Sequence, residues 1–185
     1  THLRIARENV IVIGTHTADL YGHERLGGHR WTHALGGGCD HIKLSGDGTI
    51  VGCIDGGRNV HIMTENGIQR GRFSSGELIL IAVANDGTGV AVADDEGNVN
   101  VLDSNGNLRW KRSPDSDSGE TVSAMCFMHD GSLLLCREVL GITPSEVAQI
   151  ALEKWSSTGE KLFSEEINSL TIFDDNKHIG IPPPG

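Results

Sequence analysis

A short turn signature recurs along this chain at a nearly constant interval. Each copy joins an apolar segment to an acidic residue, usually followed by Gly, and then to a second apolar segment. The acidic residues are Glu8, Asp47, Asp86, Asp130 and Asp175, so successive copies are 39, 39, 44 and 45 residues apart. A period near ~40 residues with several short strands in each repeat is typical of a β-propeller blade.

Each repeat is expected to form a four-stranded antiparallel sheet. Alternation of apolar and polar residues with a period of two predicts four strands in the third repeat, at 78–83, 89–94, 99–103 and 108–112. The connections between these strands are rich in Asp, Asn and Gly, which accept the left-handed backbone that tight turns need. No helix of consequence is needed anywhere.

The whole chain, residues 1–185, is therefore predicted to be a single arc of an all-β propeller. Its four full blades and two strands of a fifth are placed at about 1–35, 38–73, 78–112, 121–166 and 168–181. Blades normally close in a ring, which leaves no sheet face open. We expect another segment or another chain to complete this ring, with a compact closed ring of five blades as the alternative.

Bulk composition excludes some classes of function. The net charge of −10 disfavours a general nucleic-acid binder, which needs clustered Lys and Arg to neutralise phosphates. No apolar run approaches the ~20 residues of a membrane-spanning helix, so no membrane partner is expected. The sequence also starts directly in a strand pattern, without the basic, apolar and small-residue segments that follow one another in a signal peptide.

The four cysteines fall in two pairs, Cys39 with Cys53 and Cys126 with Cys136. If each pair flanks a hairpin turn, its members are diagonal neighbours, ~7–8 Å apart. That separation exceeds ordinary disulfide geometry, so buried free thiols are favoured over disulfides. The spacings match no zinc pattern, so no metal site is predicted.

The segment 101–110 resembles the strand-three to strand-four signature of pyrroloquinoline-quinone-like repeat propellers. The Trp of that signature stands at Trp31 and Trp110, is replaced by Phe163, and is lost near Gly71. WD-repeat propellers are a weaker match because the Trp-Asp dipeptide is absent. The resemblance implies a propeller fold. Quinone-binding members of the group would carry eight blades, adjacent cysteines and calcium-holding carboxylates, so the resemblance does not imply a quinone cofactor here.

Two irregular loops are the best sequence candidates for a binding surface. The repeat is longest at 114–120 and 139–147, and both insertions fall on the connections that emerge at one face of a propeller. The residues predicted for a partner surface there are Asp115, Asp117, Glu120, Leu140, Ile142 and Pro144. The alternative is that these loops vary without a function.

Two histidines, His2 and His41, occupy equivalent places on innermost strands, where side chains can line a central channel. The alternative for both is an ordinary strand histidine facing solvent or a polar partner. No serine lies in a nucleophile-elbow pattern, and no catalytic set or metal-ligand group is identified.

The sequence therefore favours a non-enzymatic protein–protein interaction or scaffold module without a cofactor. Its partner would be another protein, or a second chain that completes the propeller, as in a homo-oligomer. The alternative function is a fragment of a propeller enzyme, a hydrolase or a quinone-dependent dehydrogenase, with its site at the channel mouth.

Overall fold

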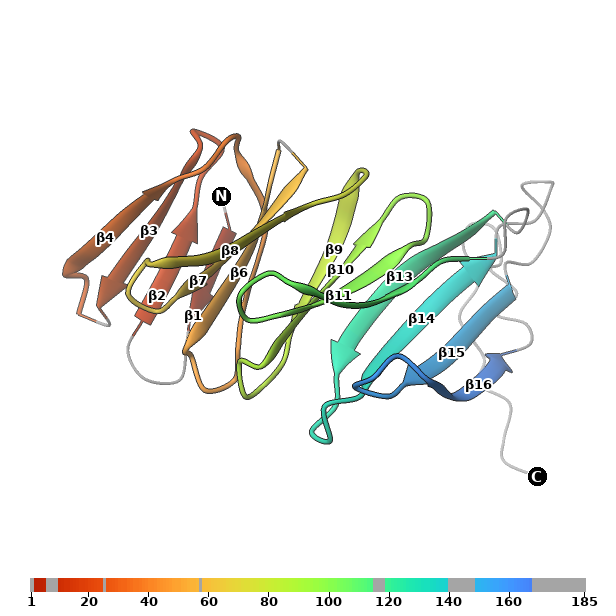
Figure 1. The fold of residues 1–185 in the computed structure, drawn as a ribbon. Helices are drawn as coiled ribbons and strands as arrows, with labels where there is room; N and C mark the ends of the chain where they lie inside the picture. Colours follow the sequence, from red (N-terminus) through yellow and green to blue (C-terminus); the bar gives the residue numbers. More distant parts are fainter. Residues whose placement is uncertain are drawn as a thin grey trace, which may run out of the picture.

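The computed structural model describes residues 2–5, 10–24, 26–56, 58–114, 119–139 and 149–167. Over these residues the chain forms strands and turns without a helix, as the all-β prediction requires. The strands make four antiparallel sheets of four strands each, and every sheet is built in chain order (Figure 1). The predicted fifth blade at 168–181 lies outside the described residues.

The strands of the four sheets have the following bounds. The first sheet contains β1 (His2–Ile5), β2 (Val10–Gly14), β3 (Asp19–Glu24) and β4 (His29–Ala34). The second contains β5 (Cys39–Leu44), β6 (Ile50–Asp55), β7 (Asn59–Thr64) and β8 (Gln69–Ser74). The third contains β9 (Leu78–Val83), β10 (Gly89–Asp94), β11 (Val99–Asp103) and β12 (Leu108–Arg112). The fourth contains β13 (Glu120–Phe127), β14 (Leu133–Val139), β15 (Gln149–Trp155) and β16 (Lys161–Ile167).

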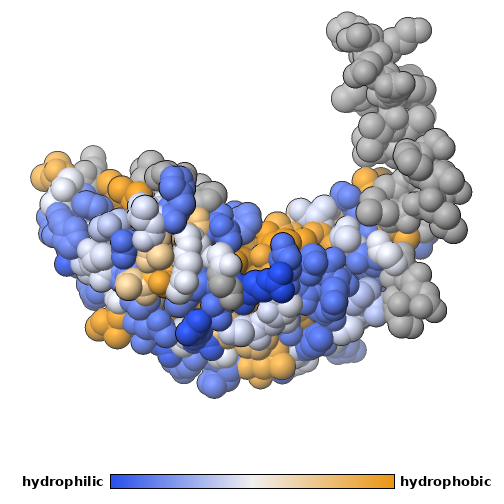
Figure 2. Space-filling model, turned by 90° about the horizontal axis from the view of Figure 1, so that it is seen from above, coloured by the Kyte–Doolittle hydropathy of each residue, from blue (hydrophilic) through white to orange (hydrophobic). Residues whose placement is uncertain are grey.

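Successive sheets pack face to face, and their first strands lie together. Strand β5 contacts β1 and β9, and β13 contacts β9. Three buried apolar clusters fill the spaces between the first and second, second and third, and third and fourth sheets. Seen from above, the described part of the chain has a crescent-shaped outline (Figure 2). Each inner sheet therefore buries both faces, which no single sheet could do alone.

A contact between an aromatic ring and a glycine recurs between the sheets. The Trp31 ring lies against Gly67 in the next sheet, and its indole N–H donates to the Glu65 carbonyl oxygen at 2.8 Å. The Trp110 ring lies against Gly159, and its N–H donates to the carbonyl oxygen of Ser157 at 3.1 Å. Each glycine has a positive φ at the tip of the turn between the third and fourth strands of its sheet.

The second sheet contacts the turn between the third and fourth strands of the third sheet without an aromatic ring. Gly71 pairs with Ile62 beside a bulge, as Trp110 pairs with Val101 beside a bulge. A Cβ on Gly71 would overlap the backbone of the next sheet's turn at Asn105. The tryptophan that the repeat loses here is thus replaced by direct approach of one backbone to another.

A buried network of charges joins the third and fourth sheets. Glu153 is 1% exposed and accepts hydrogen bonds from Arg137 Nε at 2.9 Å and Lys161 Nζ at 3.1 Å. Arg112 in β12 lies 3.7 Å from Glu153 and also pairs with Glu120. The charged groups neutralise one another in the interface, which is what allows them to be buried.

Cys39 and Cys53 are free thiols that lie closer together than predicted. Their sulfur atoms are 3.1 Å apart, because the pairing of β5 with β6 shifts between Cys39 and His41. Cys39 pairs with Asp55, two residues from Cys53, so the two cysteines are diagonal neighbours, as predicted. The β-bulge places both side chains on one face of the sheet and lets their sulfur atoms meet, so the prediction that the pair is too far apart for close contact was wrong. Burial was wrong for the other pair, since Cys126 is exposed and Cys136 only half-buried.

Candidate functional site: a pocket among three strand turns

The turns between the first and second strands of three sheets share one local design. Asp47 Oδ1 accepts from the Thr49 backbone N–H at 3.0 Å and from its hydroxyl at 2.9 Å. Asp86 Oδ1 accepts from Thr88 in the same way, at 3.1 and 2.8 Å. In the fourth sheet the corresponding acceptor is Asp130, with a serine two residues later as the donor. The side chain of Asp thereby replaces a backbone partner within each turn.

The first-to-second-strand turns of the second and third sheets are hydrogen-bonded to each other. The Asp47 backbone N–H donates to the carbonyl oxygen of Asn85 at 2.9 Å. A Cβ on Gly46 would overlap the Asn85 side chain, so only glycine leaves room for this approach. The recurring Asp-Gly turn therefore sets the position of one sheet tip relative to the next.

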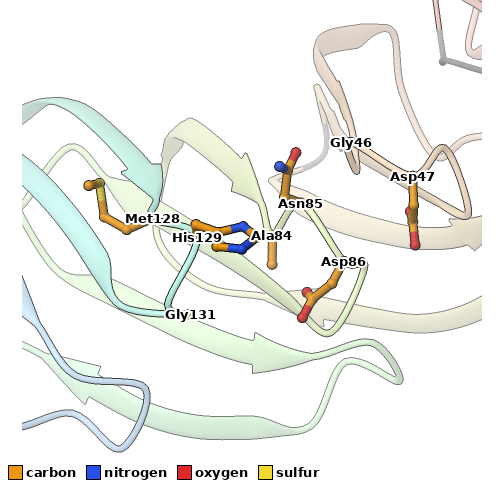
Figure 3. A pocket seen from close by; sticks show the side chains of 8 residues that line it. All are labelled: Gly46, Asp47, Ala84, Asn85, Asp86, Met128, His129 and Gly131. Carbon is orange, nitrogen blue, oxygen red and sulfur yellow. The ribbon is translucent and has the colours of Figure 1, made fainter.

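A pocket of about 340 Å³ lies among the three turns (Figure 3). Its lining comes from the second, third and fourth sheets: Gly46, Asp47, Ala84, Asn85, Asp86, Met128, His129 and Gly131. The side chains of Asp47, Asn85, Asp86 and His129 are exposed at its rim, as is Met128. The pocket thus combines polar side chains with one accessible thioether.

The rim of the pocket is anionic. Hydrogen bonds from Thr88 lower the pKa of Asp86. Burial alone would raise the pKa of Asp47, but hydrogen bonds from Ser45 and Thr49 outweigh it and lower that pKa too. The nearby Asp130 has its pKa lowered chiefly by a hydrogen bond from Lys154, at 2.8 Å. Among the described residues neither Asp47 nor Asp86 forms an ion pair, so both carboxylates offer negative charge to a ligand.

The binding surface predicted from the sequence belongs to connections at the other end of the sheets. First-to-second turns and second-to-third connections lie at opposite ends of an antiparallel sheet. The predicted residues Asp115, Asp117, Leu140, Ile142 and Pro144 lie outside the described residues. The pocket itself was missed, although its signal was the same Asp-Gly turn that revealed the repeat.

Glu120 does not lie on an exposed loop as predicted. It begins strand β13, is buried, and pairs with Arg112 and with Arg137 at 3.7 Å. Its carboxylate therefore serves the interface between sheets, where a charged partner on each side offsets its burial.

The two histidines predicted to line a channel occupy matching places in their sheets. His2 pairs with Gly14 and His41 with Ile54, each the fifth residue of the second strand. His41 is half-buried on β5 and is not part of the pocket lining. Their role at a channel stays a prediction.

Across the residues that the structure describes, no group of three or more His, Cys, Asp or Glu side chains is placed to hold a metal ion. Over the same residues no helix is long and apolar enough to cross a membrane.

Comparison with solved structures identifies the fold. The chain is similar to BamB from Moraxella catarrhalis, a β-propeller repeat protein, with a TM-score of 0.56 and 18% sequence identity. The likeness covers 88% of this chain and 60% of the BamB chain, so the chain spans less than two thirds of its length. No family model and no curated protein matches the sequence. The pyrroloquinoline-quinone-like repeat family therefore stays a prediction, whereas the four sheets, with this likeness, show a β-propeller fold.

Proposed function

We propose that the chain is a protein–protein interaction module, a single propeller arc whose turn pocket binds a basic segment of a partner protein. The observation that carries this proposal is the convergence of three turns, from three packed sheets, on one open anionic pocket. Loops and turns held by a rigid scaffold are common binding sites. Opposite charge on the partner would steer its approach and fix its orientation.

The lining suits a side chain of a peptide better than an enclosed substrate. Asp47 and Asp86 supply carboxylates that form no ion pair among the described residues and can attract a Lys or Arg head group, and Met128 supplies a soft apolar contact for its alkyl chain. The enzyme alternative would need a nucleophile or a matched acid and base at this mouth. Among the described lining residues His129 stands near carboxylates, but no Ser, Cys, Lys or Tyr accompanies it.

The loop surface predicted at the opposite end, at Asp115, Asp117, Leu140, Ile142 and Pro144, is retained as a second proposed contact. It would let one arc hold two partners or two parts of one partner, which is the property of a scaffold. Completion of the arc by another segment or chain belongs to the same proposal.

The test compares charge variants that preserve the turn. Fluorescence anisotropy would measure binding of Arg- and Lys-containing peptides, with the same peptides carrying Glu as a reference. We expect Asp47→Asn combined with Asp86→Asn to weaken binding of the basic peptides at least ~10-fold, and added salt to weaken the unsubstituted protein in the same direction.

Asp103→Asn is the matched control. Asp103 is half-buried and accepts hydrogen bonds from the backbone N–H groups of Asn105 and Asn107, but it lies at the turn between the third and fourth strands of the third sheet and does not line the pocket. The proposal would be abandoned if basic peptides bound no better than acidic ones, or if Asp103→Asn weakened binding as much as the double variant.

A further inference from the structure

The contact between an aromatic ring and a glycine of the next sheet involves two positions, and each of the four described sheets has a residue at both. One half is the residue of the fourth strand that pairs beside the bulge: Trp31, Gly71, Trp110 and Phe163. The other half is the glycine with a left-handed backbone at the tip of the turn between the third and fourth strands, here called the outer turn: Gly27, Gly67, Gly106 and Gly159. Each of these glycines donates its N–H to the carbonyl oxygen three residues earlier, so the four turns are equivalent.

Contacts between successive sheets use three members of each series. Trp31 lies on Gly67, Gly71 on the Asn105–Gly106 backbone, and Trp110 on Gly159. Among the described residues Phe163 and Gly27 make no contact of this kind, and they lie in the fourth and the first sheet, at opposite ends of the series. An added Cβ would meet Trp31 at 2.6 Å from Gly67 and Trp110 at 2.8 Å from Gly159, whereas at Gly27 it would meet no atom within 4 Å.

Phe163 lies on the outward face of the fourth sheet, where apolar side chains stand beside the charged Lys154 and Glu165. It pairs with Lys154, and because side chains alternate across a strand it shares a face with Leu134 and Leu152, opposite the residues packed on the third sheet. Phe163 is 43% exposed and Ile167, on the same face, is 44% exposed. Rings at the equivalent position in the first and third sheets are covered by the next sheet.

The first sheet presents the complementary end face. Ile11, Ile13, Tyr21 and His23 alternate with Val12 and Leu20, which are buried against the second sheet, so the former point away from it. The Gly27 turn belongs to this same face, because the equivalent Gly67 turn faces the preceding sheet. The two ends of the arc therefore carry the two halves of the contact already used inside it.

We propose that a second copy of this chain covers these end faces, with Phe163 of each copy lying on the Gly27 turn of the other. A contact between different faces of identical chains is head-to-tail, and it closes when the rotation brings the ends together. The four described sheets of each copy would together make eight, which is within the usual range of about four to eight blades in a propeller ring. This inference rests on the proposed function only in that the arc is completed by another chain.

Sedimentation equilibrium over a range of concentrations tests the proposal. We expect a reversible dimer, with a mass twice the 19.8 kDa of the chain. Phe163→Asp should weaken association at least ~10-fold, because a carboxylate would have to be buried against the opposing turn. Gly27→Asn, which tolerates the left-handed backbone but adds a side chain, should weaken it similarly.

Mixing the two variants identifies the occupant. Phe163→Asp retains an intact Gly27 turn and Gly27→Asn retains an intact ring, so their mixture can form one native contact and should associate more tightly than either alone. Leu108→Asp is the control, since Leu108 is 51% exposed beside Trp110 but belongs to neither end face, and it should dimerise normally.

A monomer at every concentration would overturn the proposal, as would a dimer that Phe163→Asp leaves intact, or a mixture no tighter than its components. Circular dichroism would verify that each variant is folded. Binding of basic peptides to the turn pocket, measured on the same variants, separates this result from the fate of the proposed function. A monomer that binds them refutes only the end-face contact, and a dimer that does not bind them refutes only the pocket.

Discussion

Removal of one buried charge tests how the third and fourth sheets are held together. Glu153 is 1% exposed, and its carboxylate oxygens accept hydrogen bonds from Arg137, Lys161 and Trp155 at 2.9, 3.1 and 3.0 Å. Glu153→Gln keeps the shape of the side chain but removes its charge. The 7%-exposed Arg112 and its neighbour Arg137 would then share the single carboxylate of Glu120.

The expected loss follows from the burial of those cations. Breaking a buried ion pair by removing one partner costs about 3–5 kcal/mol, because the other charge is left without compensation. Glutamine still offers one acceptor oxygen, and Lys161 can reach solvent, so we expect about 3 kcal/mol, the lower end of that range. Unfolding in urea, followed by fluorescence and circular dichroism at neutral pH, would measure it.

The pH dependence gives a second, independent readout. Burial alone would raise the pKa of Glu153, but hydrogen bonds from Trp155 and Lys161 and the Arg112 charge outweigh it and hold the pKa below its ordinary value of 4.5. A carboxyl group with a lowered folded pKa stabilises the fold above its unfolded pKa and loses that contribution as pH falls through the folded pKa. The stability gap between the unsubstituted protein and Glu153→Gln should therefore be full at pH 7 and shrink below about pH 4.5.

Glu166→Gln is the matched control for both readouts. Glu166 pairs opposite Ala151 in the same sheet but is exposed, so its substitution should change stability by less than about 0.5 kcal/mol. If Glu153→Gln lost less than about 1 kcal/mol, or if the gap stayed constant down to acidic pH, the network would not stabilise the interface as argued.

Substitutions at other places test separate contacts. Trp110→Phe leaves a smaller aromatic ring and loses the N–H donated to Ser157, so urea unfolding should show a loss of at least about 1 kcal/mol, and an unchanged midpoint would contradict that bond. Gly159→Ala adds a Cβ 2.8 Å from Trp110 at a positive φ, and the same assay should show a loss of about 2 kcal/mol or more. Alkylation at mildly alkaline pH, read by mass spectrometry, should modify the exposed Cys126 in the folded protein. Cys53 should react only after unfolding, because a hydrogen bond with the neighbouring thiol and burial both raise its pKa; equal rates would refute this.

The features predicted correctly from the sequence are those set by neighbouring residues. The four strands of the third sheet have the predicted bounds, because alternation of apolar residues over 78–112 and Asn-Gly or Asp-Gly turns are both local signals. The features missed depend on register. One inserted residue, Asp40, shifts the pairing of β5 with β6 and brings the sulfur of Cys39 to 3.1 Å from that of Cys53.

The candidate site was harder to predict, because its residues gain their roles from different sheets. In the sequence Glu120 looks like the last residue of a polar loop. Its role depends on the ion-pair network with Arg112 and Glu153, which lie 8 residues before it and 33 after it and come close only in the folded chain. The pocket among the turns needs the approach of Asp47 to Asn85, which lie 38 residues apart in sequence. Sequence spacing shows that such turns recur, but not that their tips meet.

The lost tryptophan at Gly71 shows what the repeat actually conserves within this chain. In two interfaces an aromatic ring fills the space above the next glycine turn, and in the third the space is absent because the two backbones touch. The common requirement is a filled contact between a fourth strand and the following outer turn, not a particular residue. A sequence signature based on tryptophan would therefore score the second sheet as degenerate, although its fourth strand also lies directly on the following turn. By the same reasoning Phe163 is a full member of the series, and the proposed end-face contact would give its exposed ring the kind of cover that Trp31 and Trp110 receive.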